Sequence, residues 1–405
     1  LIAAAWESAV FANSYHAIQL KGLEALFNST NGEQWIWSTG WLDAALGVCG
    51  WYGVTCYDNG DNVTGLALPD NGLVGNLSKA EQLFDMTSLQ SLDLSGNKLV
   101  GSVALGFGLM PKLETLDLSR NQLSSFPENW GLGASSLQHL LLQHNNISGT
   151  LPSAWINLNT SKSHPLVHVE EFSRWLPELR TLSLGSNQIT MTVYLALQSV
   201  IGLPSLQALD LSGNALGGEL NAAFDLYHCE GGSLSNCDST LHNSRAPSLT
   251  TLLLASNAIE GTLEADALPK SLFVFSVSDN HLYGPVPEDY SQLSVFFAEG
   301  NEGLNDTLLP SFASYVNNSA VVVSHENLSC PVITGNIAGG TTMRLRLDPS
   351  YIDYIHCVCV KGMEFNSDGG CQPCAAGTYR SYTELFTSPS CEACPTNAIT
   401  LTTVS

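Results

Sequence analysis

One eleven-residue pattern recurs along most of the chain and constrains the fold more than any other feature. It has the form L-x-x-L-x-L-x-x-N-x-L, as in LQSLDLSGNKL from Leu89 and LQALDLSGNAL from Leu206. Its Asn stands at Asn97, Asn121, Asn145, Asn187, Asn214, Asn257 and Asn280, the last in a looser copy. Seven copies in one chain exclude a chance match and indicate a repeat architecture.

The spacing within the pattern predicts a coil that cannot fold alone. Side chains alternate across a strand, so the central L-x-L segment is expected to form a short strand with both Leu side chains inward. The Asn follows where the chain must turn, and its amide can pair backbone groups that neighbouring coils would otherwise bury unpaired. One coil cannot bury its Leu face, so coils must stack into a one-dimensional solenoid.

In most coils a Gly follows the final Leu by two residues, and in two coils a Pro comes soon after it (Gly149 with Pro152, Gly284 with Pro287). This pattern resembles the plant-type leucine-rich repeat over roughly residues 62–301. The resemblance implies a curved α/β-type solenoid with a parallel sheet on its concave face, which is the usual binding face of the family. The central column of that face is predicted at Asp93, Asp117, Leu141, Ser183, Asp210, Leu253 and Ser276.

This predicted column contains none of the residues that dominate protein interfaces, which are Trp, Tyr and Arg. Its three Asp residues could attract a cation, but other coils separate them, so a solvated role is the favoured interpretation. The column therefore weakens, without excluding, a dedicated peptide-receptor hypothesis.

The intervals between successive Asn residues divide the chain. Asn145 and Asn187 are 42 residues apart and Asn214 and Asn257 are 43 apart, whereas the other intervals from Asn71 onward are 23 to 27 residues. The long intervals predict insertions near 159–177 and 224–247, which solenoids accommodate as surface loops. We expect a helix and disulfide cap over 1–61, the repeats over 62–301, a C-terminal cap over 302–356 and a small disulfide-rich module over 357–405.

The predicted N-terminal cap combines an amphipathic helix over 16–27 with the segment CGWYGVTC. This segment resembles the C-x-W-x-G-V-x-C motif of plant-type caps, with Cys49, Trp51, Gly53, Val54 and Cys56 at the motif positions. The resemblance implies a Cys49–Cys56 disulfide that holds a cover over the exposed end of the solenoid.

Four tryptophans gather in the predicted cap, and two roles are open to them. Trp41 and Trp51 are natural lids over the Leu-lined end of the solenoid. The alternative is that the whole cluster, Trp35, Trp37, Trp41 and Trp51, binds carbohydrate, and cap core is the favoured interpretation.

Composition and sequons place the chain outside the cell. Its 14 basic and 37 acidic residues give a net charge of −23, which disfavours nucleic acid and anionic membrane surfaces as partners. Sequons of the form N-x-S/T predict N-linked glycans at Asn28, Asn62, Asn76, Asn146, Asn159, Asn305, Asn317 and Asn327. Together with paired cysteines they indicate the secretory pathway. No run of 18 apolar residues is present, so no direct membrane span is expected.

The cysteine-rich tail contains C-x-x-G-T-Y at Cys374 to Tyr379 and a partial copy at Cys359 to Gly362. This resembles the ephrin-receptor-like cysteine-rich module, which implies disulfides Cys359–Cys371 and Cys374–Cys391, with Cys330–Cys357 joining the module to the cap. Cys229 and Cys237 are expected to close a local loop in the second insertion.

These pairings leave Cys394 unpaired. We therefore expect the natural polypeptide to continue beyond Ser405, with an intermolecular disulfide as the alternative. A four-thiolate zinc site at Cys371, Cys374, Cys391 and Cys394 also fits the spacing, but an oxidising compartment favours disulfides.

No catalytic motif is found: the chain has no G-x-S-x-G elbow, no H-E-x-x-H pair and no phosphate-binding loop. We therefore predict no enzyme activity, no cofactor and no metal centre. The combined architecture resembles surface proteins of algae and other protists. This implies a structural or adhesive glycoprotein of a coat, wall or filament, such as a flagellar hair, whose partners are other copies or other surface glycoproteins. The alternatives are a ligand-binding receptor ectodomain and a secreted enzyme inhibitor.

Overall fold

The structure is a computed structural model of the 405-residue chain. It describes residues 2–43, 45–57, 62–152, 155, 176–201, 203–220, 248–264, 268–287, 290, 293, 295–298 and 300–304, and the short strands at 322–324, 363–365, 371–373, 378–379 and 392–393. The chain divides into two compact units. The first comprises 1–261 and 267–272, and the second comprises 262–266 and 273–405.

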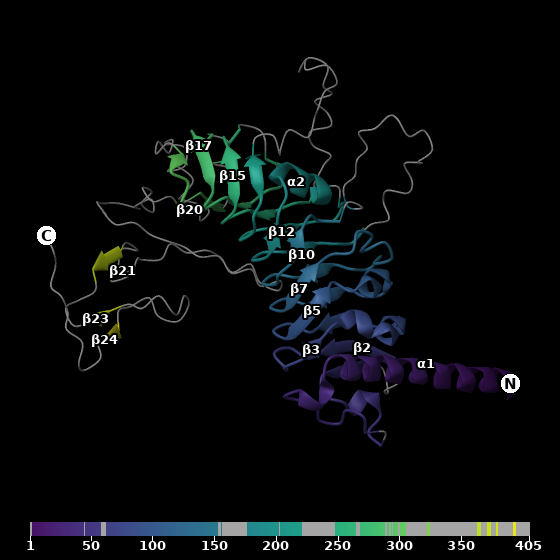
Figure 1. Ribbon diagram of the computed structural model, residues 1–405. Helices are drawn as coiled ribbons and strands as arrows, with labels where there is room; N and C mark the ends of the chain where they lie inside the picture. The colour runs from purple at the N-terminus through teal and green to yellow at the C-terminus, as the bar shows by residue number, and fades with distance from the viewer. Residues whose placement is uncertain are drawn as a thin grey trace, which may run out of the picture. The chain divides into compact units, whose positions relative to one another are not determined.

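In the first unit the predicted strands form one sheet, with one strand from each coil (Figure 1). Each strand pairs in parallel with the next, so that Leu92 lies opposite Leu116 and Leu116 opposite Leu140. An antiparallel strand, β1, pairs with β2 at the N-terminal edge. The strands are β1 (Val54–Tyr57), β2 (Asn62–Ala67), β4 (Ser91–Asp93), β6 (Thr115–Asp117), β8 (His139–Leu141), β10 (Thr181–Ser183), β12 (Ala208–Asp210) and β14 (Thr251–Leu253).

Shorter strands run along the chain segment that follows each Asn. They are β3 (Val74–Gly75), β5 (Lys98–Ser102), β7 (Gln122–Ser125), β9 (Ser148–Gly149), β11 (Gln188–Ile189), β13 (Gly217–Glu219) and β15 (Ala258–Gly261). Between them and the next main strand lie short 3₁₀ helices, η3 (Leu77–Lys79), η4 (Glu81–Asp85) and η5 (Leu105–Leu109). These coils therefore contain the strand and the turn that the pattern predicts, and the structure adds the return segment.

In one coil the segment that leads to the next main strand is an α-helix, α2 (Val193–Ile201). The repeat pattern does not predict this helix. Val193, Ala196, Leu197 and Val200 are all fully buried, and they follow the i, i+3, i+4, i+7 spacing of an apolar helix face. The sequence therefore contained the signal for this helix.

The core is a continuous column of aliphatic side chains. Leu92, Leu116 and Leu140 are each 0% exposed, as are the second leucines of the same strand segments, such as Leu94 and Leu118. Their stacking confirms that the Leu positions of the pattern are structural. The fold class predicted for the repeats, a parallel-sheet solenoid, is confirmed.

The N-terminal helix is longer than predicted. It spans α1 (Ile2–Ser29) instead of 16–27, because residues 2–15 contain five alanines and no Gly or Pro and so favour helix. Leu23 and Leu26 are fully buried on its inner side. Two 3₁₀ helices follow, η1 (Gly32–Gln34) and η2 (Val48–Gly50).

The cap has the predicted disulfide, since Cys49 and Cys56 are bonded. Trp35, Trp41 and Trp51 are 8% exposed or less and pack on one another, with ring centroids 4.7 Å apart for Trp35 and Trp41 and 5.0 Å for Trp41 and Trp51. These three tryptophans therefore form cap core, as predicted for Trp41 and Trp51. Trp37 differs, because it is 55% exposed.

We expect removal of the Cys49–Cys56 bond by Cys49→Ser with Cys56→Ser to lower the free energy of unfolding by about 2 kcal/mol. The bond closes a short loop and limits the entropy of the unfolded chain. Denaturant unfolding of the oxidised wild type and of the double variant checks this. Equal midpoints would show that aromatic packing alone holds the cap.

In the second unit β16 (Val274–Ser276), β18 (Val295–Phe297) and β20 (Val322–Ser324) pair in parallel, and β17 (His281–Gly284) pairs with β19 (Gly303–Leu304). β20 is a strand inside the stretch expected to be only a cap. The tail has two antiparallel pairs, β21 (Met363–Phe365) with β22 (Cys371–Pro373) and β23 (Thr378–Tyr379) with β24 (Glu392–Ala393).

Several predictions fall outside the described residues. They include most of both insertions and the C-terminal cap apart from β19 and β20. The remaining predicted disulfides also involve positions outside this part of the chain, apart from Cys371, the first residue of β22. The ephrin-receptor-like module, its pairings and the zinc alternative stay predictions.

Candidate functional site

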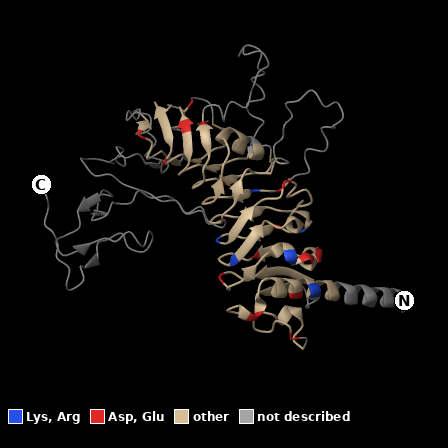
Figure 2. Ribbon diagram, in the orientation of Figure 1, with Lys and Arg blue, Asp and Glu red and all other residues tan. Residues whose placement is uncertain are grey.

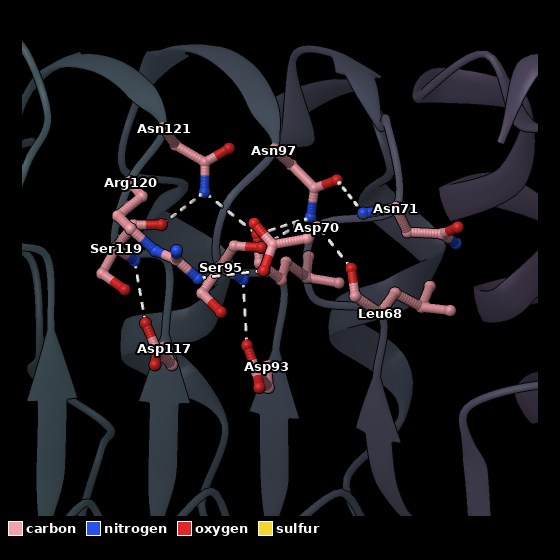
Figure 3. A network of polar contacts seen from close by, with 11 residues as sticks. Leu68, Asp70, Asn71, Asp93, Ser95, Asn97, Asp117, Ser119, Arg120 and Asn121 are labelled. Carbon is pink, nitrogen blue, oxygen red and sulfur yellow. Dashed lines mark hydrogen bonds and ion pairs between the residues drawn. The ribbon is translucent and has the colours of Figure 1, made fainter. Parts of the chain in front are cut away.

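The predicted concave column lies where the pattern placed it, at the last residue of each main strand from β4 to β16. Its Asp residues have a structural task. The Asp93, Asp117 and Asp210 carboxylates each accept a hydrogen bond, at 2.9 Å, from the backbone N–H two residues later. Figure 3 shows the first two of these bonds. Each closes the turn that follows its strand. Among the described residues, no three His, Cys, Asp or Glu side chains gather as a metal site.

Asp210 is the most enclosed of these carboxylates. Its oxygens also accept hydrogen bonds from the Ser212 hydroxyl at 2.6 Å and the Ser183 hydroxyl at 3.3 Å. Burial raises the pKa of Asp210 above its ordinary value, and the Ser212 and Ser183 bonds oppose part of that rise. Burial raises the pKa of Asp117 in the same way.

This arrangement predicts a stability that falls as the pH rises. A carboxyl whose pKa is raised in the folded state gives its full stabilisation of the fold at pH values below its unfolded-state pKa. That stabilisation is lost as the pH rises through the folded-state pKa. The Asn side chain of Asp210→Asn cannot titrate. We therefore expect the melting temperature of this variant, measured relative to that of wild type, to be higher at pH 7 than at pH 4. Thermal melts at both pH values check this, with the exposed Glu114→Gln as control. An Asp210→Asn difference that is the same at both pH values would contradict the burial effect.

The repeat Asn side chains form a hydrogen-bonded ladder between coils, as predicted (Figure 3). Asn97 donates to the Leu94 carbonyl in its own coil and to the Leu68 carbonyl in the preceding coil, both at 2.9 Å. Its Oδ1 accepts from the N–H groups of Asn71 and Leu73. Equivalent hydrogen bonds, both within the coil that contains the Asn and to the preceding coil, are made by Asn121, Asn145, Asn187, Asn214 and Asn257.

The residue before each Asn has a positive φ, which the repeat pattern does not reveal. The values run from 49° to 69° at Asp70, Gly96, Arg120, His144, Ser186, Gly213, Ser256, Asp279 and Gly300. Only some of these residues are Gly or Asp, so the ladder imposes a backbone conformation that most L-residues disfavour.

One ion pair crosses this row of turns. Arg120 and Asp70 approach to 3.1 Å, and the pair passes over Gly96, where a Cβ would overlap the Asp70 carboxylate. Both side chains are more than half exposed, so the pair adds little stability. The ion pair joins two coils that are separated by the coil of Gly96, and it restrains two side chains at the edge of the sheet.

The accessible side chains of the sheet are not mainly those of the predicted column. Leu141, Ser183, Leu253 and Ser276 are buried there. The exposed or half-exposed positions are the residues immediately before each main strand, which we term the strand-entry row: Gln90, Glu114, Gln138, Arg180, Gln207 and Thr250. The first strand residues, such as Ser91, Thr115 and His139, are accessible beside them. The sequence signal for the strand-entry row is the residue after the first Leu of each repeat.

Backbone hydrogen bonds between neighbouring coils hold the strand-entry row in place. The Gln90 carbonyl accepts from the N–H groups of Glu114 and Thr115, at 2.7 and 3.0 Å, and the Glu114 carbonyl accepts in the same way from Gln138 and His139. Neighbouring strands in a sheet are about 4.8 Å apart, so the row presents one polar side chain at each such interval. His139 contacts the Thr181 hydroxyl at 3.1 Å, and burial, followed by the Arg180 charge, lowers the His139 pKa.

The sequons within the described residues lie at accessible positions. Asn28, Asn62 and Asn146 are exposed, whereas Asn76 is half-buried and its Oδ1 accepts from the Ser78 N–H. Asn159, Asn305, Asn317 and Asn327 lie outside the described part. Glycosylation at all eight stays a prediction.

Comparison with known proteins agrees with the fold. A leucine-rich repeat model matches residues 87–147, and a second one matches residues 202–219. Receptor-like protein 18 of Arabidopsis thaliana is 28% identical over 257 residues, which cover 60% of this chain and 28% of that protein. Receptor-like protein 35 of the same plant is 31% identical over 224 residues, covering 49% of this chain and 22% of that protein. The chain thus spans about a quarter of the length of these relatives.

A solved structure described as PEPR1-AtPEP1 superposes with a TM-score of 0.50 at 23% identity, covering 76% of this chain and 42% of that one, which supports the fold alone. In the described part of this chain, no helix combines the length and the hydropathy needed to cross a bilayer. From the repeats, the ladder and these matches, we conclude that the chain carries leucine-rich repeats and folds as a leucine-rich repeat solenoid.

Proposed function

We propose that this chain is a non-enzymatic extracellular scaffold that binds an extended protein segment across the sheet of its first unit. The strand-entry row carries the proposal. It offers amide, charged and hydroxyl side chains, one for each coil, directly before strands whose own backbone groups are already paired. Such groups can form hydrogen bonds with the backbone of a partner, and the hydrogen-bonded backbone that holds them reduces the cost of ordering on binding.

The charges of the row favour a partner with an acidic group near β10. Arg180 is exposed and lies beside His139, in a chain whose net charge is −23. A partner carboxylate could form a charge-assisted bond with the Arg180 guanidinium. The Arabidopsis relatives are receptor-like proteins, which agrees with an ectodomain that recognises proteins.

A displayed library of random twelve-residue peptides, selected on the whole chain, tests the proposal. Selected peptides should bind Arg180→Glu and Thr115→Arg at least tenfold more weakly than wild type. They should bind Lys98→Glu unchanged, because Lys98 is exposed on β5, away from the main strands. Peptides that bind all variants equally, or a library that yields no binders, would contradict the assignment.

A second candidate function, a subunit of a surface coat, wall or filament, rests on a different surface. Leu105, Leu109 and Leu132 are 43%, 53% and 50% exposed. The Gly133 N–H donates to the Gly108 carbonyl at 2.8 Å, which holds the turn with Leu132 beside η5. This leucine patch would bury apolar area against a second copy of the chain.

The assembly state tests this second candidate. Light scattering after size exclusion should give a concentration-dependent oligomer for wild type, which Leu109→Ser with Leu132→Ser reduces to monomer. Val100→Ser is the control, since Val100 is 40% exposed on β5. A wild type that is monomeric at all concentrations would remove this candidate.

A further inference from the structure

Trp37 is the exception among the tryptophans whose side-chain exposure the structure describes. It is 55% exposed, whereas Trp35, Trp41, Trp51, Trp130 and Trp155 are each 8% exposed or less. A large aromatic side chain left partly in water forgoes part of the stabilisation that burial would give. An exposed aromatic on an ordered surface is therefore a candidate contact for a ligand.

Trp37 has an aromatic neighbour. The Tyr52 ring is 6.3 Å from it, centroid to centroid, and the two ring planes differ by 31°. Tyr52 is 42% exposed, so both rings are accessible. The two rings are near enough in position and tilt to act as one aromatic surface, which we term the cap platform.

The rest of the cap holds the platform in place. The Trp37 N–H donates to Asn71 Oδ1 at 2.6 Å, and Asn71 Nδ2 donates to the Trp37 carbonyl at 2.9 Å. Asn71 is itself fully buried at the start of the ladder. The Tyr52 N–H donates to the Thr39 carbonyl, and the Tyr52 carbonyl accepts from the Trp41 indole, both at 2.9 Å. A ligand would therefore meet rings whose backbones are already fixed.

The charge around the platform limits the ligand. The sequence has no Lys or Arg between Lys21 and Lys79, and the charged residues within that range are acidic, which Figure 2 colours red where the structure describes them. Such a surface disfavours phosphate-rich, sulfated or otherwise anionic ligands. The exposed Thr39 and the half-buried Ser38 provide neutral hydrogen-bonding groups next to Trp37 in the sequence.

We propose that Trp37 and Tyr52 form a stacking site for a neutral oligosaccharide. The face of an aromatic ring carries negative charge density, which complements the weakly positive C–H groups on the face of a pyranose ring. The sugar hydroxyls would remain at the ring edges, in reach of water and of polar side chains. The pair of rings accommodates adjacent units of a saccharide chain. This site lies on the cap and is independent of the strand-entry row.

The ligand could be a free polysaccharide or a glycan attached to another protein, because both present the same sugar faces. Cellohexaose represents the first source, and a released high-mannose N-glycan represents the second. Titration calorimetry of the whole chain with each probe distinguishes them. We expect at least one probe to bind wild type, Trp37→Ala to weaken that binding at least tenfold and Tyr52→Ala to weaken it as well.

Phe273→Ala is the matched control, since Phe273 is also 55% exposed but belongs to the second unit, and it should leave binding unchanged. Circular dichroism shows whether each variant remains folded, and Trp37→Phe, which keeps a ring, should retain part of the affinity. The proposal is overturned if neither probe binds wild type at millimolar concentration, or if Trp37→Ala binds as wild type does. It is also overturned if the surface captures only a Leu-rich amphipathic peptide, because Ile36 and Leu42 are exposed nearby and would favour an apolar protein instead.

Discussion

Asn121→Ala is expected to lower the free energy of unfolding by about 2 to 4 kcal/mol, because it leaves the Leu99 N–H without its acceptor and removes three further hydrogen bonds of the Asn121 side chain. Asn121 is 6% exposed. Its Oδ1 accepts from the Leu99 N–H at 3.0 Å, and its Nδ2 donates to the Leu94, Leu118 and Ser119 carbonyls at 3.0 to 3.1 Å. These carbonyls also accept from other donors, whereas the Leu99 N–H relies on the Asn121 side chain and would lose its acceptor.

Denaturant unfolding measures this loss, and two further variants locate its cause. Asn121→Asp keeps the shape and the acceptor but cannot donate, so at neutral pH it should also be destabilised. Gln122→Ala, at the exposed neighbouring position of β7, should change the unfolding free energy by no more than about 0.5 kcal/mol. If Asn121→Ala were as stable as Gln122→Ala, the ladder would not hold the coils together.

Trp130→Ala should cost about 3 to 5 kcal/mol, a large part of the stability of an ordinary domain. Trp130 is 0% exposed, and its indole N–H donates to the Ala104 carbonyl at 3.0 Å. It packs against Phe126 and Trp155, with ring centroids 5.6 and 6.3 Å away, and the Trp155 indole donates to the Trp130 carbonyl. The substitution would open a cavity and remove the shorter of two hydrogen bonds to the Ala104 carbonyl, which would keep only the Phe107 N–H at 3.3 Å.

Thermal and denaturant unfolding measure this effect. The exposed Leu132→Ala, two residues further along the chain, serves as the control and should be nearly neutral. A small loss for Trp130→Ala would mean that neighbouring side chains collapse into the space and that the aromatic cluster contributes little.

The repeats could be predicted from the sequence because one chemical requirement recurs in each coil. Leu92, Leu116 and Leu140 repeat a buried strand position, and the Asn that follows each strand repeats a backbone-pairing task. These requirements come from local spacing, and so the strands and the ladder follow from it, whereas the Cys49–Cys56 bond was implied by the resemblance of CGWYGVTC to plant-type caps.

The candidate site was harder to predict because accessibility depends on how coils pack. The central column was the expected binding surface, yet Leu141 and Leu253 are buried and Asp210 is used to close its own turn. The repeat pattern marks the strand-entry row as the residue after the first Leu, but the exposure of these side chains depends on how the coils pack. Trp37 belonged to a cluster of four tryptophans in the sequence, and only the packing of the other three separates it from them.

Hydrogen exchange of the whole chain tests the central claim, that a ladder of buried side-chain amides joins successive coils. The informative amides donate to an Asn Oδ1 of the next coil: Leu73, Leu99, Leu123, Ile147, Ile189 and Leu216. We predict that they exchange as slowly as the amides of the main strands, since both are paired and lie in the same stack. Exchange of these six amides at the rate of exposed loops would contradict the ladder.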